Sequence, residues 1–249
     1  MNSKPVIVAL DKPDLHSAVE LAKLLDPELC RVKVGKELFT SAGPGVVSAM
    51  HDLGLEVFLD LKFHDIPNTV AGACRSAAGL GVWMLNVHAS GGPAMLSAAR
   101  DAIGEPSSGT PLLIGVTVLT SVDDTELAAT GVTCSTEEQV DRLTGLVSQC
   151  GLDGVVCSAH EATNVKDNYP GLMSVTPGIR MTDDSADDQR RIMTPERALQ
   201  NGSTFLVIGR SVTGASNPAE RLQSIQQSLG NVQQNGIDTR CSTTTQPNK

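Results

Sequence analysis

The segment from Phe58 to Thr69 reads Phe58-Leu59-Asp60-Leu61-Lys62-Phe63-His64-Asp65-Ile66-Pro67-Asn68-Thr69. It begins as an apolar strand and ends in the charge pattern D-x-K-x-x-D, formed by Asp60, Lys62 and Asp65. Side chains two apart on a strand share a face, so Asp60 and Lys62 are expected together, with Asp65 returning to them from the loop. Two carboxylates around one ammonium are costly to remove from water. The cluster therefore indicates a functional site more than a stabilising device.

The same unit, an apolar strand followed by an amphipathic segment, recurs along the chain. The strands are nearly continuous apolar runs, which is typical of parallel strands buried on both faces. Strands are expected at Val6–Leu10, Cys30–Val34, Glu56–Leu61, Val82–Val87, Leu112–Val118, Gly154–Cys157, Leu172–Val175 and Thr204–Ile208. Helices are expected at Leu15–Leu25, Val46–Leu53, Val70–Gly79, Ala94–Ile103, Glu137–Cys150, Pro195–Asn201 and Pro218–Leu229.

These eight units predict a single α/β domain at residues 1–229, a (β/α)8 TIM barrel with its active site at the C-terminal ends of the strands. A doubly wound open sheet is the alternative, because strand count alone does not prove closure. No G-x-G-x-x-G fingerprint follows the first strand, which disfavours a dinucleotide-binding sheet. Residues 230–249 are rich in Asn, Gln and Thr and are expected to form a disordered tail.

Charge and cysteine usage exclude several classes of protein. The chain carries 19 Lys and Arg against 28 Asp and Glu, a net charge of −9, and no basic run. Its field would repel nucleic acid and anionic membranes, so neither is an expected partner, and an anionic substrate would need a local cationic pocket. The six cysteines form no C-x-x-C pair and fit no zinc template, so no metal is expected. The absence of a signal peptide or membrane-spanning run predicts a cytoplasmic protein with reduced thiols.

In a barrel, polar residues at the strand ends converge on one mouth. The candidates are Asp11, Lys33, Asp60, Lys62, Asn86, His88, Thr120, Ser121, Arg180 and Arg210. Any one of them alone is ordinarily a solvated residue, and only their joint alignment supports a site. The turns Gly178-Ile179-Arg180 and Gly209-Arg210-Ser211 follow the last two strands, where barrels often bind phosphate.

His88 and the pair Cys157 and His160 each have a functional and a structural interpretation. His88 could act as a base or ligand, but a hydrogen-bonded structural histidine is favoured. Cys157 with His160 could form a nucleophile and base pair. No third activating group is evident, and Cys157 ends an apolar strand, so a core cysteine is favoured.

The segment Asp60–Thr69 resembles the signature of the orotidine 5′-phosphate decarboxylase family, the last enzymes of UMP synthesis. The resemblance covers roughly residues 5–225, and the chain is similar to the shorter bacterial form of the family. Further matching motifs, in the same order, are Ala9-Leu10-Asp11, Val32-Lys33-Val34-Gly35, Val87-His88-Ala89, Leu119-Thr120-Ser121, Pro177-Gly178-Ile179-Arg180, Asp188-Gln189-Arg190-Arg191 and Ile208-Gly209-Arg210.

The resemblance implies a role for each residue of the charged cluster. Asp11 would bind the ribose, and Lys33 would contact both the ribose and the charged network. Asp60 would lie beside the substrate carboxylate, and Lys62 would donate the proton. Asp65 would complete an alternating Lys33-Asp60-Lys62-Asp65 array. The resemblance implies no cofactor.

The resemblance also implies a homodimer and a phosphate clamp. Asp65, Ile66 and Thr69 would reach into the neighbouring subunit's site. Thr120 would contact the pyrimidine edge. The phosphate of orotidine 5′-phosphate, or of the product UMP, would be held by Arg180, Gln189, Gly209 and Arg210. Gln189 lies in the polar stretch 181–191, which is either a solvated loop or a lid over the substrate.

Two rival functions share part of this pattern. A related phosphosugar decarboxylase or aldolase also uses D-x-K-x-x-D, but with Mg²⁺ and an acidic partner on the second strand. This chain has Lys33 there, and an ammonium beside Asp60 would oppose a divalent cation. A non-catalytic nucleotide-binding protein would keep the arginines but would not need Lys62 between two acids.

Overall fold

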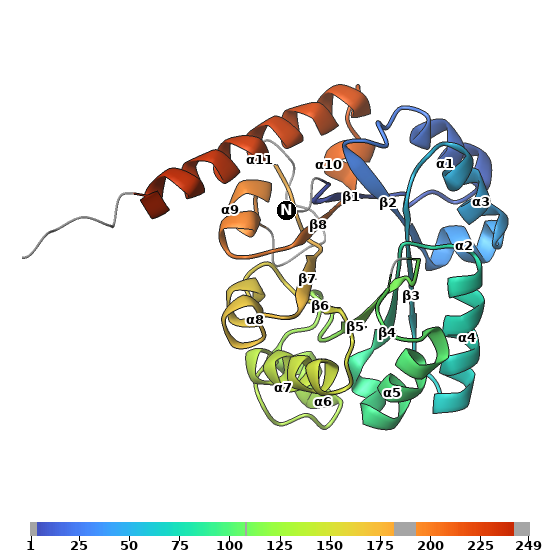
Figure 1. Cartoon of the computed structure of the whole chain (residues 1–249), viewed down its shortest axis with the longest axis vertical. Helices are drawn as coiled ribbons and strands as arrows, with labels where there is room; N and C mark the ends of the chain where they lie inside the picture. The colour runs from blue at the N-terminus through green and yellow to red at the C-terminus, as the bar shows by residue number, and fades with distance from the viewer. Residues whose placement is uncertain (1–3, 108, 182–192, 242–249) are drawn as a thin grey trace, which may run out of the picture.

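Eight parallel strands form a closed barrel with helices around its outside (Figure 1). The computed structural model of the chain describes residues 4–107, 109–181 and 193–241. Each strand hydrogen-bonds the next one in the sequence, and β1 also pairs with β8, which closes the sheet. The (β/α)8 prediction is therefore confirmed, and the open doubly wound sheet is wrong.

The strands lie within two residues of their predicted bounds. Their order follows the sequence around the barrel. They are β1 Val6–Ala9, β2 Cys30–Gly35, β3 Val57–Phe63, β4 Met84–His88, β5 Leu112–Val116, β6 Gly154–Val156, β7 Met173–Thr176 and β8 Phe205–Ile208.

The helices include all seven predicted ones, together with short helices that the apolar pattern did not reveal. The predicted ones are α1 Leu15–Ala22, α3 Gly45–Asp52, α4 Pro67–Gly79, α5 Gly92–Ile103, α7 Thr136–Gln149, α9 Pro195–Gln200 and α11 Pro218–Cys241. The additional ones are α2 Lys36–Ala42, the 3-10 turn η1 Ala89–Gly91, α6 Asp124–Ala129, α8 Ala162–Asn168 and α10 Arg210–Thr213.

The core has two layers, one inside the barrel and one between the strands and the helices. Alternation along β1 divides its residues between them: Ile7 points into the barrel, while Val6 and Val8 pack under the helices. The barrel interior is filled by Ile7, Ala9, Phe58, Met84, Ile114, Val175, Phe205 and Val207. A filled interior leaves room for chemistry only at the mouth of the barrel.

Strand β3 is irregular at the point where its charged residues begin. Its pairing with β4 joins Leu59 to Leu85 and next Phe63 to Val87, so four steps on β3 are matched by two on β4. Lys62, within this bulge, has a φ of 52°, the one left-handed non-glycine residue in the described chain. The expected strand alternation therefore does not explain why Lys62 lies beside Asp60; the bulge redirects the side chain.

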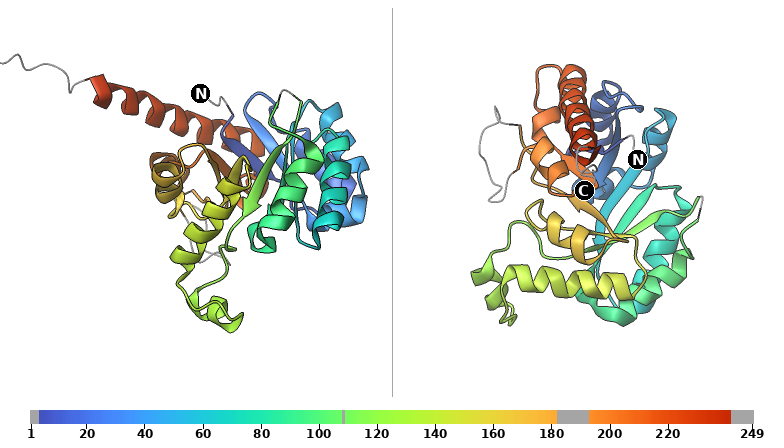
Figure 2. Two further views of the ribbon diagram at one scale, coloured as in Figure 1. Left: turned by 60° about the horizontal axis from the view of Figure 1, so that its bottom comes forward. Right: turned by 60° about the vertical axis from the view of Figure 1, so that its left-hand side comes forward.

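The last helix, α11, continues to Cys241 and extends beyond the edge of the barrel (Figure 2). The side chains Leu222, Ile225 and Leu229 bury its first half against the barrel. The expected disordered tail at 230–249 thus differs from the structure over 230–241, which are helical. The segment has no proline before residue 247, and its glutamines are compatible with a helix once α11 is nucleated on the barrel. Residues 242–249 lie outside the described residues.

Candidate active site

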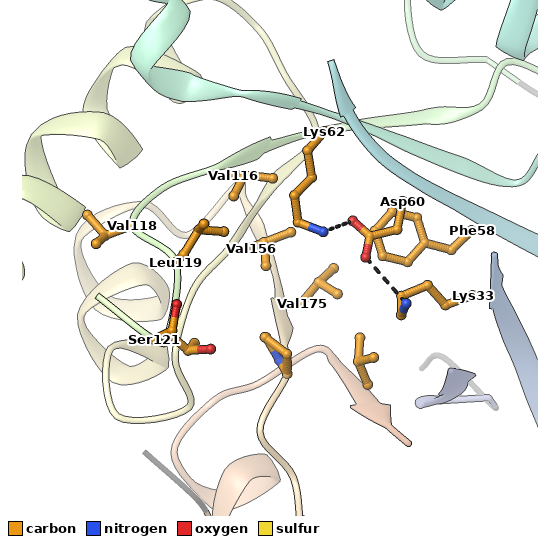
Figure 3. A pocket seen from close by; sticks show the side chains of 13 residues that line it. Lys33, Phe58, Asp60, Lys62, Val116, Val118, Leu119, Ser121, Val156 and Val175 are labelled. Atoms are coloured by element: carbon orange, nitrogen blue, oxygen red, sulfur yellow. Dashed lines mark hydrogen bonds and ion pairs between the residues drawn. The ribbon is translucent and has the colours of Figure 1, made fainter. Parts of the chain in front are cut away.

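Two lysines approach one buried carboxylate at the mouth of the barrel (Figure 3). Lys62 Nζ lies 2.5 Å from Asp60 Oδ1, and Lys33 Nζ lies 3.5 Å from Asp60 Oδ2. Lys33 Nζ also lies 3.1 Å from Asp11 Oδ1, beyond the end of β1. The register of β2 and β3, which pairs Gly35 with Asp60, sets Lys33 next to the bulge. The structure therefore brings together four of the residues predicted from the sequence.

Asp60 is held as a carboxylate although it is only 8% exposed. Burial opposes ionisation, but the charges of Lys33 and Lys62 outweigh it. Hydrogen bonds from Lys62 and from Asn86 act in the same direction, so the pKa of Asp60 lies below its ordinary value of 3.8. A fixed negative charge between two ammonium groups results, in a partly dehydrated site.

Asn86 on β4 is a member of this cluster to which the sequence assigned no role. It is fully buried. Its Nδ2 donates to Asp60 Oδ1 at 2.7 Å, and its Oδ1 accepts from the backbone N–H of Lys62 at 2.8 Å. One signal was present in the sequence, because Asn86 is an amide within the apolar run from Met84 to Val87.

A cavity of about 310 Å³ opens beside the cluster. Lys33, Asp60 and Lys62 line it on one side, and Thr120 and Ser121, between β5 and α6, also line it. The remaining lining is largely apolar and comes from Phe58, Val116, Val118, Leu119, Val156, Val175, Pro177 and Val207. A mainly apolar pocket with a few convergent charges at the carboxyl ends of barrel strands is typical of a small-molecule site.

The loop after β7 and the end of β8 border this cavity. Pro177 and Val207 line it, and each is followed three residues later by an arginine, Arg180 or Arg210. Arg180 is 9% exposed, and Arg210 begins α10 directly after Gly209. A Cβ placed on Gly209 would lie 3.9 Å from Asp11 Oδ2, so this turn adjoins the charged cluster.

The predicted lid lies almost entirely outside the described residues. This applies to Gln189 and to the whole stretch 182–192. The residues on either side of that stretch are paired: Ile179 forms a bridge with Met193, and the Arg180 N–H donates to the Met193 carbonyl at 3.0 Å. Both ends of the segment are therefore anchored beside Arg180.

Asp65 does not join the cluster of its own chain. In the part of the chain that the structure describes, no ion pair connects it to Lys33 or Lys62, and its Oδ1 accepts from the backbone N–H of Ile66 at 2.6 Å. Asp65, Ile66 and Thr69 are all exposed, and Ile66 is 66% exposed. The expectation that Asp65 returns to Lys62 within one chain is therefore wrong, because the loop carries it outward to the start of α4.

His88 and Cys157 have different surroundings in the structure. His88 is half-buried beside His64, with ring centroids 5.4 Å apart. Burial and the nearby His64, Lys36 and Lys62 lower the pKa of His88 from 6.5 to about 4, against the attraction of Asp60. Cys157 is fully buried in the apolar core, and burial raises the pKa of its thiol. A buried, protonated thiol fits the predicted core cysteine and not a nucleophile.

The described residues form neither a metal-binding cluster nor a helix that could cross a membrane. No three His, Cys, Asp or Glu side chains among them converge as metal ligands. None of the helices described combines the length and apolar character that crossing a bilayer requires.

Comparison with known proteins places this geometry in context. Residues 4–225 match the model of the orotidine 5′-phosphate decarboxylase / HUMPS family. The chain is 55% identical to orotidine 5′-phosphate decarboxylase of Pseudomonas aeruginosa over 226 residues, which is 91% of this chain and 97% of the relative. It is also 55% identical to the enzyme of the same name from Pseudomonas fluorescens over 221 residues, 89% of this chain and 95% of the relative.

The fold has a similar solved counterpart. The crystal structure of orotidine 5′-phosphate decarboxylase from Lactobacillus acidophilus superimposes with a TM-score of 0.81 at 36% identity. The match covers 91% of this chain and 99% of that one. The structural similarity therefore extends over most of the chain.

Proposed function

The chain belongs to the orotidine 5′-phosphate decarboxylase / HUMPS family, and on this premise we propose that it decarboxylates orotidine 5′-phosphate to UMP. The observation that carries the proposal is the alternating row of Lys33, Asp60 and Lys62 along one side of an apolar cavity. A nucleotide base fits the apolar part of the cavity. Loss of a carboxylate group from that base leaves negative charge on the reacting carbon, which needs a cation close by.

The reaction requires stabilisation of a localised charge. When the bond between C6 and the carboxylate breaks, its electron pair remains on C6 in an orbital with poor resonance delocalisation. The Lys62 ammonium, held by Asp60, stabilises this charge electrostatically and then transfers a proton to C6 as carbon dioxide leaves. The lysine amine regains its proton from water. No step needs a cofactor.

Asp60 has two roles in this proposal. It fixes the positions of both ammonium groups, since each of its oxygens faces one lysine. It would also face the substrate carboxylate, and repulsion between like charges disfavours the bound substrate more than the transition state, where charge has moved to C6. Lys33 and Asp11 would orient the ribose between them.

Phosphate binding would take place at the ends of β7 and β8, next to the charged cluster. Arg180, Arg210 and the backbone at Gly209 lie just beyond these strand ends, and guanidinium groups form charge-assisted hydrogen bonds with phosphate. Binding free energy from this remote group would order the array and close the 181–191 segment, including Gln189, over the substrate.

A second subunit would complete the site. Asp65, Ile66 and Thr69 form an exposed strip at the start of α4. An exposed isoleucine beside an aspartate that forms no ion pair with the described residues fits a surface covered by another copy of the chain. In a twofold-symmetric dimer, the partner's Asp65 would approach Lys62 and complete the alternating array.

The proposal is tested by following the loss of orotidylate absorbance with purified protein, with and without a chelator. Decarboxylation that is insensitive to EDTA is expected, because Lys33 lies 3.5 Å from Asp60 and its charge opposes a divalent cation there. Activity that depends on Mg²⁺, with a phosphosugar as substrate, would support the metal-dependent rival. Nucleotide binding without turnover would support a non-catalytic protein.

A further inference from the structure

The β3 bulge leaves a gap in the hydrogen-bond ladder next to the reactive lysine. Between the pairs Leu59–Leu85 and Phe63–Val87, only Asn86 on β4 faces the extra residues of β3. Backbone groups buried in such a gap need another partner, because an unsatisfied buried N–H costs about 1–3 kcal/mol.

Asn86 supplies that partner with its side chain. Its Oδ1 accepts from the Lys62 backbone N–H at 2.8 Å, which replaces the missing ladder bond. The same amide donates through Nδ2 to Asp60 Oδ1 at 2.7 Å. Reversing the amide would oppose its NH₂ group to the Lys62 N–H and its oxygen to a carboxylate, so the two contacts fix one orientation.

The conformation of Lys62 makes this contact consequential. A lysine in the left-handed region, with φ at 52°, is in a conformation that costs free energy unless the surroundings hold it. The hydrogen bond that the Lys62 N–H donates to Asn86 Oδ1 holds the backbone of Lys62 in the conformation that sends Nζ to Asp60.

We propose that Asn86 is a positioning residue for decarboxylation, which sets the backbone of Lys62 and the carboxylate of Asp60 with one amide. The inference rests on the proposed function and deepens it. Asn86 lies behind the two residues that would meet the substrate and acts through them. It would couple the orientation of the proton donor to that of its counter-ion.

The first test is Asn86→Leu, which keeps the side-chain volume nearly constant and removes both hydrogen bonds. We expect kcat for orotidine 5′-phosphate to fall about 100-fold, since a displaced catalytic group costs on that order. The KM and the affinity for UMP should stay near the parental values, because the phosphate and ribose contacts are untouched. Without the Nδ2 donor, the pKa of Asp60 should rise, which moves the acidic limb of the kcat/KM profile to higher pH.

Asn86→Asp separates the two contacts and serves if Asn86→Leu does not fold. It keeps an oxygen for the Lys62 N–H but places a second carboxylate against Asp60. The acidic limb should therefore move further up in pH than in Asn86→Leu, because like charges disfavour ionisation of both groups. Circular dichroism and UMP binding verify that each variant is folded.

Thr176→Val is the matched control. Thr176 is a buried polar residue on β7 that also makes two hydrogen bonds, to the Ser203 hydroxyl and the Phe205 carbonyl, away from the charged cluster. It should lower stability without moving the acidic limb. The inference is overturned if folded Asn86 variants keep the parental kcat, if the limb does not move, or if Thr176→Val reproduces the effect. A parent protein that does not turn over orotidine 5′-phosphate would instead refute the proposed function.

Discussion

Lys62 is the residue on which the proposed chemistry depends most directly. Lys62→Ala should abolish decarboxylation, because both the cation beside C6 and the proton source are lost, while binding of UMP remains measurable. Steady-state turnover and UMP titration check this. Lys23→Ala, at the exposed residue that follows α1 and pairs with Glu20, is the control and should leave both unchanged. Near-normal turnover by Lys62→Ala would remove Lys62 from its role.

His88 gives a prediction about pH and stability. Its pKa lies near 4 in the folded chain and near 6.5 when unfolded, so the unfolded state binds a proton in this range while the folded state does not. The contribution of His88 to the free energy of unfolding is therefore fully present above pH 6.5 and is lost as the pH falls toward 4. Between pH 7 and pH 4, we expect the free energy of unfolding of His88→Gln to fall by about 2 kcal/mol less than that of the parent protein.

Urea unfolding of the parent and His88→Gln at several pH values between 7 and 4 measures this difference. Since the other titrating groups are shared, the difference between the two curves isolates His88. Curves that stay parallel over the whole range would show that His88 is not held neutral in the fold.

At the residue scale, the sequence predicted the charged members of the site but not how they are held. Asp11, Lys33, Asp60 and Lys62 were predicted because charges at the ends of buried parallel strands have one place to converge. The role of Asn86 could not be read, because it depends on a bulge whose register is set by pairing between strands. The outward direction of Asp65 likewise depends on where α4 begins.

Packing between β5 and α7 shows how closely the elements fit. A Cβ added to Gly115 would lie 2.2 Å from Val147 Cγ2. We expect Gly115→Ala to destabilise the fold by about 1–3 kcal/mol through overpacking, and Val147→Ala to do so by about 2 kcal/mol through a cavity. In the double variant the new methyl group occupies space that Val147 vacated, so the total should be less than the sum.

Denaturant midpoints of the four proteins in this cycle give the coupling. Gly171→Ala is the control, since a Cβ there meets nothing within 4 Å, and its effect should add to that of Val147→Ala. Additive costs for Gly115→Ala and Val147→Ala would mean that β5 and α7 relax apart independently.

The elements themselves were largely predictable, with one physical exception. The strands were found because their apolar runs are buried on both faces, as the complete burial of Val6, Ile7 and Val8 illustrates. Short helices such as α6 were not found, because six residues with one buried leucine give too little periodicity. The N-terminus of α6 is set instead by a capping box between Asp123 and Glu126.

The extent of the folding unit is a prediction at the scale of the whole molecule. We propose that residues up to 229 form the complete barrel domain, since α11 packs through Leu222, Ile225 and Leu229. A chain ended at Gly230 should keep the parental melting temperature and turnover. Ile225→Ala, which removes a buried anchor of the same helix, should cost about 2–5 kcal/mol. A large loss of stability on truncation would extend the domain to the end of α11.

Sharing of sites between subunits is tested by mixing two inactive proteins. Lys62→Ala and Asp65→Ala should each be inactive, but in a mixed dimer one of the two sites combines an intact Lys62 with the partner's intact Asp65. Random reassociation makes half of the dimers mixed, so about a quarter of parental activity should return. Turnover after co-refolding, or after co-expression with two tags, measures the recovery.

Mixing Lys62→Ala with Asp60→Ala is the matched control for this geometry. Asp60 and Lys62 lie 2.5 Å apart within one chain, so neither site of the mixed dimer can hold both residues and no activity should return. Recovery in the first mixture and not in the second requires that Asp65, alone of the three, crosses to the partner's site. If verified mixed dimers of Lys62→Ala and Asp65→Ala recover no activity, the shared-site proposal is wrong. Because Asp65 points outward at the start of α4, it would then have no part in the reaction within its own chain either.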